Sequence, residues 1–441
     1  MPPDGIILDY VLWAAQETYA NPIYHLAAIL PVAAYEAASM GWGGPWGLPV
    51  RKDQGALQSF LIGSPASAKS TAMRMSRAFH LDVMRETQGA LWSEGNNPWV
   101  MAEGSVPGLL EACHDMYDAD LGVTPALMFH EEVSSLLDKG GEVIDMLMQL
   151  FDTVPVVQRN LREYRKMRKE GVKPPSDIIK PAIGGVFCGT MNSAERTLKP
   201  SHFEGGLVSR SLWFSGEPDV DRYWTAGPDA EGRRALVAGW THHGRRLSGL
   251  RLRGDASLAC LSSECKAVLQ PMFEKFRVAS KHGQEVLAAQ LQRGMGMAQV
   301  VAGIYALSGG STSITLVDME AAVKLVELSQ ATAKMLSEAT VEDLIYRLFQ
   351  KALRLIKAAG AGGLTRTDLN RHHLRTNAGI LDAIHQLLEE SGEVFITKKA
   401  GSLGRRPTIY TANEHTGPDN VYRLPRREQA DDEPADSGPQ S

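Results

Sequence analysis

The sequence predicts an α/β fold built on a parallel sheet. Between residues 54 and 254, short apolar runs alternate with stretches of helical periodicity, a pattern typical of strands joined by crossover helices. We expect strands over residues 58–62, 126–130, 183–190 and 207–214. The first of these runs leads through a loop of small residues directly into a helix, and a largely helical region follows the last.

The composition is that of an ordinary folded protein. The 441 residues are long enough for two or three domains, and 44% are hydrophobic, so each domain can have its own core. The net charge of −5 indicates no general attraction to nucleic acid, so any such surface must be local. The four cysteines lack paired metal-ligand spacing, which fits a reducing compartment. We expect a cytoplasmic protein without a signal peptide. We also expect no membrane span, because His25, Pro31 and Glu36 interrupt the apolar stretch 23–40.

Five segments are expected along the chain. Residues 1–52 form an N-terminal helical segment, and residues 53–255 hold the parallel sheet. Residues 256–340 are helical, with two long amphipathic helices near 284–307 and 317–339. Asp318 and Thr340 stand where helix N-caps belong.

The last two segments are a small module and a tail. Residues 341–414 show helices at 341–358, 366–372 and 378–390, followed by strands at 393–398 and 408–412, which is the order of a winged helix-turn-helix. Residues 415–441 form an acidic tail rich in Asp, Glu, Pro and Ser, which we expect to be disordered.

The most informative motif runs from Phe60 to Thr71 and has the order of a phosphate-binding P-loop. Backbone N–H groups of the loop and of the following helix can cradle an anion, Lys69 can reach the β- and γ-phosphates, and the Ser70 hydroxyl can bind Mg²⁺. One position departs from the pattern G-x-x-x-x-G-K-[ST], since Ala68 stands in place of the second glycine. The expected nucleotide-binding residues are Gly63, Ser64, Pro65, Ala66, Ser67, Ala68, Lys69, Ser70 and Thr71.

A second motif places two acids directly after the strand at 126–130. An NTPase needs a carboxylate that holds Mg²⁺ and usually another that activates water. We expect Glu131 to support Mg²⁺ together with Ser70, and Glu132 to act as the catalytic base. For such a motif in isolation, the alternative is a solvated acidic start of a helix.

Two further polar residues complete the expected catalytic site. Asn192 follows the strand at 183–190 and could orient the attacking water, with Thr190 as the second candidate and an ordinary turn as the alternative. Arg210 lies in an otherwise apolar run, where an unpaired charge would be costly. It either pairs with an internal carboxylate or reaches the γ-phosphate of a neighbouring subunit, which requires an oligomer with active sites between its protomers.

In this order, the motifs resemble the ATPase domain of phage- and plasmid-encoded primase–helicase proteins, a family within the RecA/AAA+ P-loop NTPases. The resemblance covers roughly residues 20 to 340 and implies that Asn192 matches the sensor 1 group, which lies on the strand beside the P-loop strand. Residues 291–322 are similar to the helical lid of minichromosome-maintenance-type helicases. There a lid arginine contacts nucleotide, and Arg293 is the matching residue; a winged helix follows that lid too.

Two basic regions are candidates for DNA contact, because clustered cations can follow a phosphate backbone without sequence preference. In related ring helicases the interval before the sensor 1 strand carries elements that point into the central channel. In this interval and in the C-terminal module, the basic residues are Arg159, Arg162, Arg165, Lys166, Arg168 and Lys169, and then Arg371, Arg375, Lys398, Lys399, Arg405 and Arg406. The alternatives are a solvated helix surface and a protein-binding role for the winged helix.

We therefore expect an ATP- and Mg²⁺-dependent DNA helicase or translocase of a phage or other mobile element, working as a ring-forming homo-oligomer, a hexamer, with replication or mobile-element proteins as partners. A DNA-bound ATP switch or loader without unwinding activity, for replication, transposition or defence, is the main alternative. Ala68 and Glu131, which replace the usual Gly and Asp, favour this alternative, because both replacements fit an ATPase with slow turnover. A transcription regulator with a vestigial nucleotide site is a third.

Overall fold

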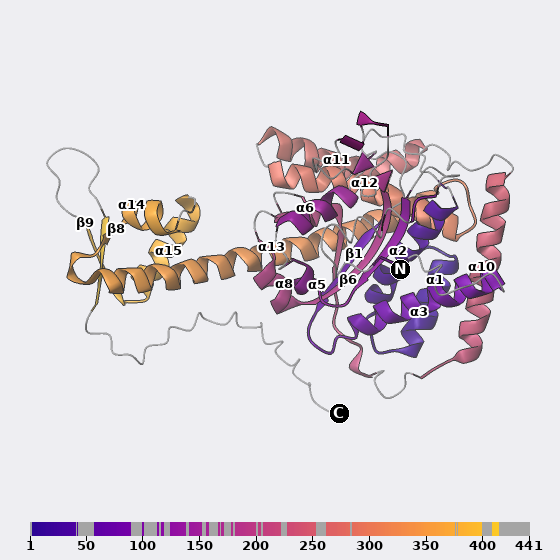
Figure 1. The fold of residues 1–441 in the computed structure, drawn as a ribbon, viewed down its shortest axis with the longest axis horizontal. Coiled ribbons are helices and arrows are strands. Elements are labelled where there is room, and N and C mark those ends of the chain that lie inside the picture. The colour runs from indigo at the N-terminus through magenta and orange to yellow at the C-terminus, as the bar shows by residue number, and fades with distance from the viewer. Residues whose placement is uncertain are drawn as a thin grey trace, which may run out of the picture. The chain divides into compact units, whose positions relative to one another are not determined.

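The computed structural model has the expected α/β architecture, and the chain divides into two compact units, residues 1–340 and 341–441 (Figure 1). It describes residues 2–40, 42, 57–89, 99–100, 113, 116–118, 124–137, 141–151, 156–157, 166–167, 169–171, 178–179, 181–199, 202–203, 206–221, 227–252, 262–282, 285–374, 376, 378–398 and 408–413.

A parallel sheet of five strands forms the centre of the first unit. Its strand order is β2 (Trp99–Val100), β3 (Thr124–His130), β6 (Pro181–Thr190), β1 (Gln58–Gly63) and β7 (Leu212–Ser215). Every residue of β1 and β3 is buried. Strands of a parallel sheet are covered on both faces, which is why these segments read as continuous apolar runs in the sequence.

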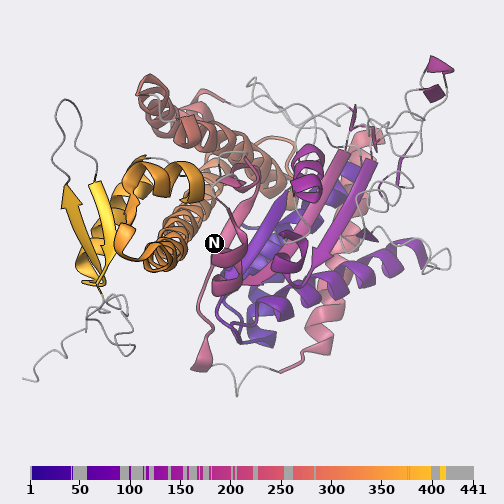
Figure 2. The same ribbon diagram turned by 60° about the vertical axis from the view of Figure 1, so that its left-hand side comes forward.

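Helices cover both faces of this sheet, as Figure 2 shows. On one face, α2 (Pro22–Ser39) packs across β1, β3, β6 and β7, and α1 (Ile6–Glu17), α3 (Lys69–Gln88), α10 (Ala230–Leu252) and α12 (Glu285–Ser308) share its core. On the other face lie α5 (Val133–Leu137), α6 (Gly141–Leu150) and α8 (Met191–Thr197). The described N-terminal helices thus belong to the same core as the sheet.

Alternate residues of β1 serve the two cores. Leu61 packs with α2 and α3, whereas Phe60 and Ile62 face the opposite core. There the Phe60 ring stacks between Phe187 and Trp213, with centroids 4.7 and 4.1 Å away. This period of two fixes the register of β1 against both of its neighbours.

The expected strand at 207–214 is wrong in its first half. The structure has a 3₁₀ helix, η3 (Val208–Arg210), before β7. The hydroxyls of Ser209 and Ser211 donate to the carbonyls of Gly206 and Leu207, each at 3.1 Å. These local hydrogen bonds stabilise a turn and replace the hydrogen bonds that a strand would make with its neighbour. Arg210 therefore precedes the strand.

The expected helix break at Thr340 is also wrong. One helix of 44 residues, α13 (Leu316–Ala359), runs through this position, and the Thr340 hydroxyl donates to the Leu336 carbonyl at 2.7 Å instead of capping a helix. No Gly or Pro occurs in this segment to stop it. At its start Thr315 is the cap, because its hydroxyl accepts a hydrogen bond from the Asp318 N–H at 3.3 Å, while Asp318 Oδ2 accepts from the Thr315 backbone N–H at 2.8 Å and from its hydroxyl.

The second unit combines the end of α13 with a small antiparallel sheet of order β8 (Leu364–Thr365), β10 (Thr408–Ala412) and β9 (Val394–Lys398). Its core includes Phe349, Ile384 and Tyr410. The expected helix at 366–372 is a short α14 (Arg366–Asp368) that continues as a π-helical turn, Leu369–Leu374, and α15 (Ala378–Glu390) follows.

The remaining described elements are β4 (Val156–Val157), paired with β5 (Ile178–Ile179), α11 (Ser263–Lys281), and the 3₁₀ turn η5 (Gly360–Gly362). In the part of the chain that the structure describes, none of the helices combines the length and the apolar character that a membrane crossing requires.

Gly184→Ala tests the contact between α2 and the sheet. A Cβ at Gly184 would lie 2.8 Å from the Pro31 carbonyl oxygen and 2.8 Å from the Leu127 side chain. We expect a loss of about 1–3 kcal/mol in the free energy of unfolding, since overpacking displaces neighbouring atoms. Urea denaturation measures it.

Gly239→Ala on α10 is the matched control, because a Cβ there meets nothing within 4 Å. A helical glycine replaced by alanine should raise stability by about 0.5–1 kcal/mol. Equal effects at both positions would contradict the close approach of α2.

Candidate functional site

The loop that joins β1 to α3 has an unusual backbone. Ala66 and Ala68 have φ angles of 69° and 57°, and among the described residues they are the non-glycine residues with positive φ. The left-handed region costs an ordinary residue about 1–2 kcal/mol relative to the right-handed one. Such strain persists where the surrounding structure enforces it, which is typical of functional sites.

The helix that follows this loop begins without a cap. Ala68 is the N-cap residue of the 20-residue helix α3, its side chain makes no capping hydrogen bond, and the first turn contains no acidic residue. The N–H groups of the first turn have no partner within a helix, and the helix dipole is positive at this end. The described loop therefore presents donors and partial positive charge to an anion.

Tyr24 of α2 fixes the start of the loop. Its hydroxyl lies 2.8 Å from the Ile62 carbonyl, 2.8 Å from the Gly216 carbonyl and 2.9 Å from the Gly216 N–H. A Cβ on Gly63 would collide with this hydroxyl and with Ser67. Tyr24 carries no local signal in the sequence, because its contacts join residues far apart in the chain.

Lys69 is only 7% exposed, at the beginning of α3. Its Nζ donates to the Ser64 carbonyl across the loop at 3.0 Å. Burial lowers the pKa of Lys69, and the nearby Cys188 and Glu132 act in the opposite direction. The ammonium group is thus held over the loop, where a phosphate would meet it.

The Cys188 thiol shows which predicted site residues gather at the loop. Burial raises its pKa to about 12, the charge of Lys69 and a hydrogen bond with Ser70 lower it, and the charges of Glu131 and Glu132 raise it. Cys188 lies on β6, next to Leu61 of β1. The structure therefore brings Lys69, Ser70, Glu131 and Glu132 together at the carboxyl ends of the central strands.

The two acids have different partners. Arg74 of α3 holds Glu131 in a bidentate ion pair, with Nε at 2.8 Å from Oε1 and with Nη2 bound to Oε2, and the pKa of Glu131 is lowered mainly by this contact. Glu132 Oε1 accepts hydrogen bonds from the hydroxyls of Ser134 at 2.7 Å and Ser193 at 3.0 Å. Ser193 follows the expected Asn192 directly and could have been noticed there, whereas nothing near Glu131 in the sequence indicates Arg74.

The candidates at the end of β6 differ in position. Thr190 pairs in register with Gly63 and is the N-cap of α8, where its hydroxyl accepts from the Ser193 N–H at 3.1 Å. Asn192 is exposed in the first turn of α8, beyond the strand.

Arg210 and Arg293 lie together at the other end of the sheet. The guanidinium groups of both residues crowd the position that a Cβ would take on Gly206, and Arg293 Nη1 donates to the Ser209 hydroxyl at 2.6 Å. Because β7 runs parallel to β1 with Leu212 opposite Ser59, Arg210 is at the amino end of the strands. Gly63 lies four residues beyond Ser59, which is about 13 Å farther along β1 at 3.3 Å per residue. The two arginines and the loop therefore occupy opposite ends of the sheet.

The structure describes some of the predicted DNA-binding residues. Lys166 is exposed and lies 3.8 Å from Glu170, Lys169 and Arg371 are exposed, and Lys398 ends β9 opposite Thr408. The remaining predicted positions lie outside the described residues: Arg159, Arg162, Arg165, Arg168, Arg375, Lys399, Arg405 and Arg406.

Comparisons with known proteins add no family to this geometry. No family model matches the sequence, and a search of curated proteins found no match.

Within the described residues, no group of three or more His, Cys, Asp and Glu side chains could hold a metal ion by itself.

Ala68→Gly should relieve the strained loop. Glycine adopts a φ of 57° without penalty, so we expect a gain of about 1 kcal/mol in the free energy of unfolding, reduced by the greater freedom of glycine in the unfolded chain. Urea denaturation in the absence of nucleotide measures it.

Ala235→Gly on the exposed side of α10 supplies the opposite sign. There the same substitution should lower the free energy of unfolding by about 1 kcal/mol, because glycine has more backbone freedom in the unfolded chain and loses it when the helix forms. A destabilisation of similar size by Ala68→Gly would show that Ala68 is unstrained.

Proposed function

We propose that the protein binds ATP with Mg²⁺ at the loop between β1 and α3, and hydrolyses it as a P-loop ATPase of the RecA/AAA+ type. The observation that carries this proposal is the uncapped start of α3, with Lys69 buried over a loop whose two alanines are held in the left-handed region. A helix N-terminus combined with backbone N–H groups in such a conformation is suited to phosphate.

The side chains around the loop can divide the chemistry. Lys69 would neutralise charge on the β- and γ-phosphates, and Ser70 with Glu131 would hold the metal, which supplies further neutralisation when bound. Glu132, oriented by Ser134 and Ser193, would accept the proton of the attacking water. Asn192 in the first turn of α8, or Thr190 at the end of the strand beside β1, would orient that water.

The two arginines at the opposite end of the sheet support a site shared between subunits. Arg210 and Arg293 are separated from their own loop by the length of β1, so we propose that both serve the nucleotide of a neighbouring subunit. A head-to-tail interface of this kind closes into a ring when its rotation permits. The resemblance to ring-forming helicases leads us to the same arrangement, a hexamer.

The second unit supports a DNA-binding role. Helices α14 and α15 lie between β8 and the hairpin of β9 and β10, an arrangement that fits a winged helix, and Arg371 is exposed on this unit. We propose that this module and the basic segment 159–169 contact DNA phosphates, and that the protein is a helicase or translocase of a mobile element.

Subunit mixing tests the shared site. Lys69→Ala should abolish ATP hydrolysis because it removes the loop cation, and Arg210→Ala should abolish hydrolysis while nucleotide binding persists. In an equal mixture of the two variants, about one quarter of randomly formed interfaces join an intact loop to an intact arginine, so about one quarter of the wild-type rate should return.

Phosphate release measures these rates, and binding of a fluorescent ATP analogue separates binding from hydrolysis. A mixture that stays inactive although the variants co-assemble would refute the shared site. If Lys69→Ala binds and hydrolyses ATP normally, the nucleotide site itself is misplaced.

DNA dependence tests the motor. Single-stranded DNA should raise the wild-type rate several-fold at low salt, and the stimulation should fall as salt rises, because phosphate contacts release counterions. A strand-displacement assay run beside it should show unwinding that Lys69→Ala abolishes. An unchanged hydrolysis rate would contradict the helicase.

One observation favours an ATP-dependent switch as the second candidate. Arg74 binds both oxygens of Glu131, so it competes with a metal for this carboxylate. Such competition with the metal would slow ATP turnover.

Arg74→Ala should therefore increase the rate of ATP hydrolysis, measured by phosphate release. A decrease in this rate would show that Arg74 helps catalysis.

A further inference from the structure

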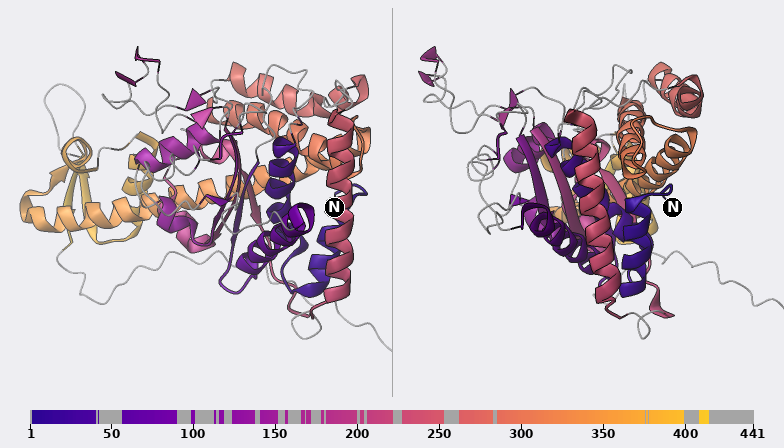
Figure 3. Two further views of the ribbon diagram at one scale, coloured as in Figure 1. Left: turned by 45° about the vertical axis from the view of Figure 1, so that its right-hand side comes forward. Right: turned by 90° about the vertical axis from the view of Figure 1, so that its right-hand side faces the viewer.

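A cavity lies between α3, α10 and the end of α2, away from the loop that joins β1 to α3. Its volume is about 450 Å³, within the range of small-molecule sites. Figure 3 shows α10 running beside the N-terminal helices. We call this cavity the α3–α10 pocket; its lining from the two helices is His80, Val83, Met84, Thr87 and Gln88 on α3, and Trp240, Thr241, Gly244, Arg245, Ser248 and Gly249 on α10.

The lining follows one stripe on each helix. The α3 residues recur at positions i, i+3, i+4, i+7 and i+8 from His80, and the same spacing holds on α10 from Thr241. Tyr35, Glu36 and Ser39 of α2, together with Met40 directly after it, complete the wall. Both long helices thus turn a continuous stripe to this cavity, while elsewhere they contact each other, as Phe79 does with Trp240 at a centroid distance of 5.2 Å.

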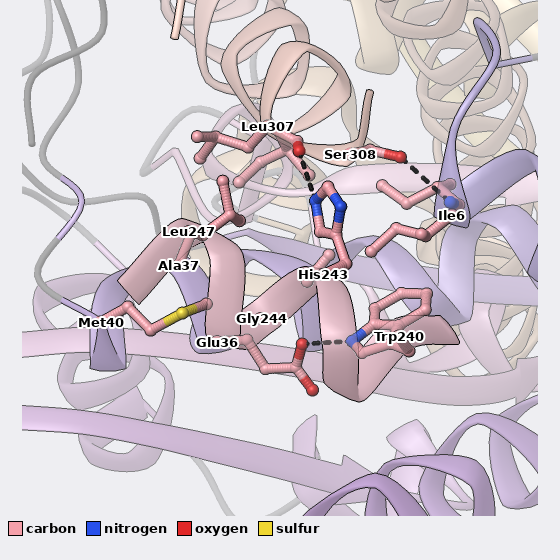
Figure 4. A pocket seen from close by; sticks show the side chains of 13 residues that line it. Ile6, Glu36, Ala37, Met40, Trp240, His243, Gly244, Leu247, Leu307 and Ser308 are labelled. Carbon is pink, nitrogen blue, oxygen red and sulfur yellow. Dashed lines mark hydrogen bonds between the residues drawn. The ribbon is translucent and has the colours of Figure 1, made fainter. Parts of the chain in front are cut away.

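A buried network fixes the polar wall of the pocket. Glu36 Oε1 lies 3.0 Å from His80 Nδ1. Glu36 Oε2 accepts a hydrogen bond from Trp240 Nε1 at 2.5 Å, and Figure 4 shows this bond beside the neighbouring small cavity. Because both carboxylate oxygens accept, His80 Nδ1 carries a proton, and in the neutral imidazole Nε2 then has a lone pair. The Glu36 charge is therefore already satisfied within the wall.

Other polar atoms of the lining have no hydrogen-bond partner among the described residues. They include His80 Nε2, Thr241 Oγ1 and Gln88 Oε1, which are all buried. His80 and Thr241 are 1% and 4% exposed. An unsatisfied buried polar atom costs about 1–3 kcal/mol, so a ligand that bonds to them would recover this energy.

Two glycines keep the pocket open. A Cβ on Gly244 or Gly249 would meet nothing within 4 Å, although glycine inside a helix costs about 0.5–1 kcal/mol relative to alanine. The surrounding walls include the rings of Tyr35 and Trp240 and the side chains of Val83 and Met84. The space is therefore mostly apolar, with aromatic edges and hydrogen-bond acceptors.

We propose that the α3–α10 pocket is a binding site for a small, uncharged, flat aromatic molecule that carries an N–H donor. The apolar walls and the aromatic rings accept its body. Because these atoms expose almost no surface in this structure, the ligand must displace neighbouring side chains before His80 Nε2 and Gln88 Oε1 accept from its N–H groups and before the Thr241 hydroxyl donates or accepts. Among the described lining residues, the Glu36 carboxylate is already paired and the charged Arg245 is exposed to solvent, so an uncharged ligand fits the wall between them.

A pair of matched probes tests the donor. 5-Fluoroindole and 5-fluorobenzofuran have nearly the same shape, but only the first has an N–H group. We expect ¹⁹F NMR titration of the full chain to show one site for 5-fluoroindole and at least tenfold weaker binding of 5-fluorobenzofuran, a difference of about 1.4 kcal/mol.

Helical glycines supply matched protein variants. The double variant Gly244→Leu/Gly249→Leu fills the pocket and should weaken 5-fluoroindole binding at least tenfold. Gly239→Leu places the same side chain on α10 outside this pocket, again with nothing within 4 Å of its Cβ, and should leave binding unchanged. Leucine favours a helix over glycine, so these variants should fold.

Binding that survives in the double variant, equal binding of the two probes, or no binding of 5-fluoroindole at millimolar concentration would each overturn the proposal. Unfolding curves recorded for all variants verify that they are folded. The assay uses no nucleotide, so its outcome is independent of the proposed ATPase.

Discussion

The burial of β1 on both faces and both edges is the constraint on which the rest of the site depends. β6 and β7 pair with it, the Phe60 ring stacks between Phe187 and Trp213, and Leu61 faces the core under α2. The strand therefore ends at a fixed point, and the chain must leave it and begin α3 within a few residues. The Tyr24 hydroxyl fixes that exit from the opposite side.

This short exit explains the strained loop. The hydrogen bond from Lys69 Nζ to the Ser64 carbonyl, together with the Ser67 N–H bond to the same carbonyl at 3.2 Å, closes a compact turn that needs left-handed backbone at Ala66 and Ala68. Two alanines occupy positions where glycine would be relaxed. The stability of the surrounding sheet and helices outweighs that cost of about 1–2 kcal/mol per residue.

The sequence could predict the parallel sheet and the grouping of Lys69, Ser70, Glu131 and Glu132, because strand ends in a parallel sheet meet at one edge. It could not predict the turn at Arg210, where serine hydroxyls outweigh an apolar run, or the continuity of α13, where Thr340 bonds within the helix. Tyr24 and Arg74 also escaped prediction. Both act through contacts between residues far apart in the chain, for which a single sequence gives no local signal.

Helix α3 joins the two proposed sites. Lys69 stands in its first turn and His80 begins the stripe that lines the α3–α10 pocket, about 16 Å along the axis at 1.5 Å per residue. A ligand that shifted this helix at the pocket would also shift its first turn. Thermodynamic linkage then makes the relation mutual: whatever factor a pocket ligand applies to anion affinity at Lys69, the anion must apply to the affinity of that ligand.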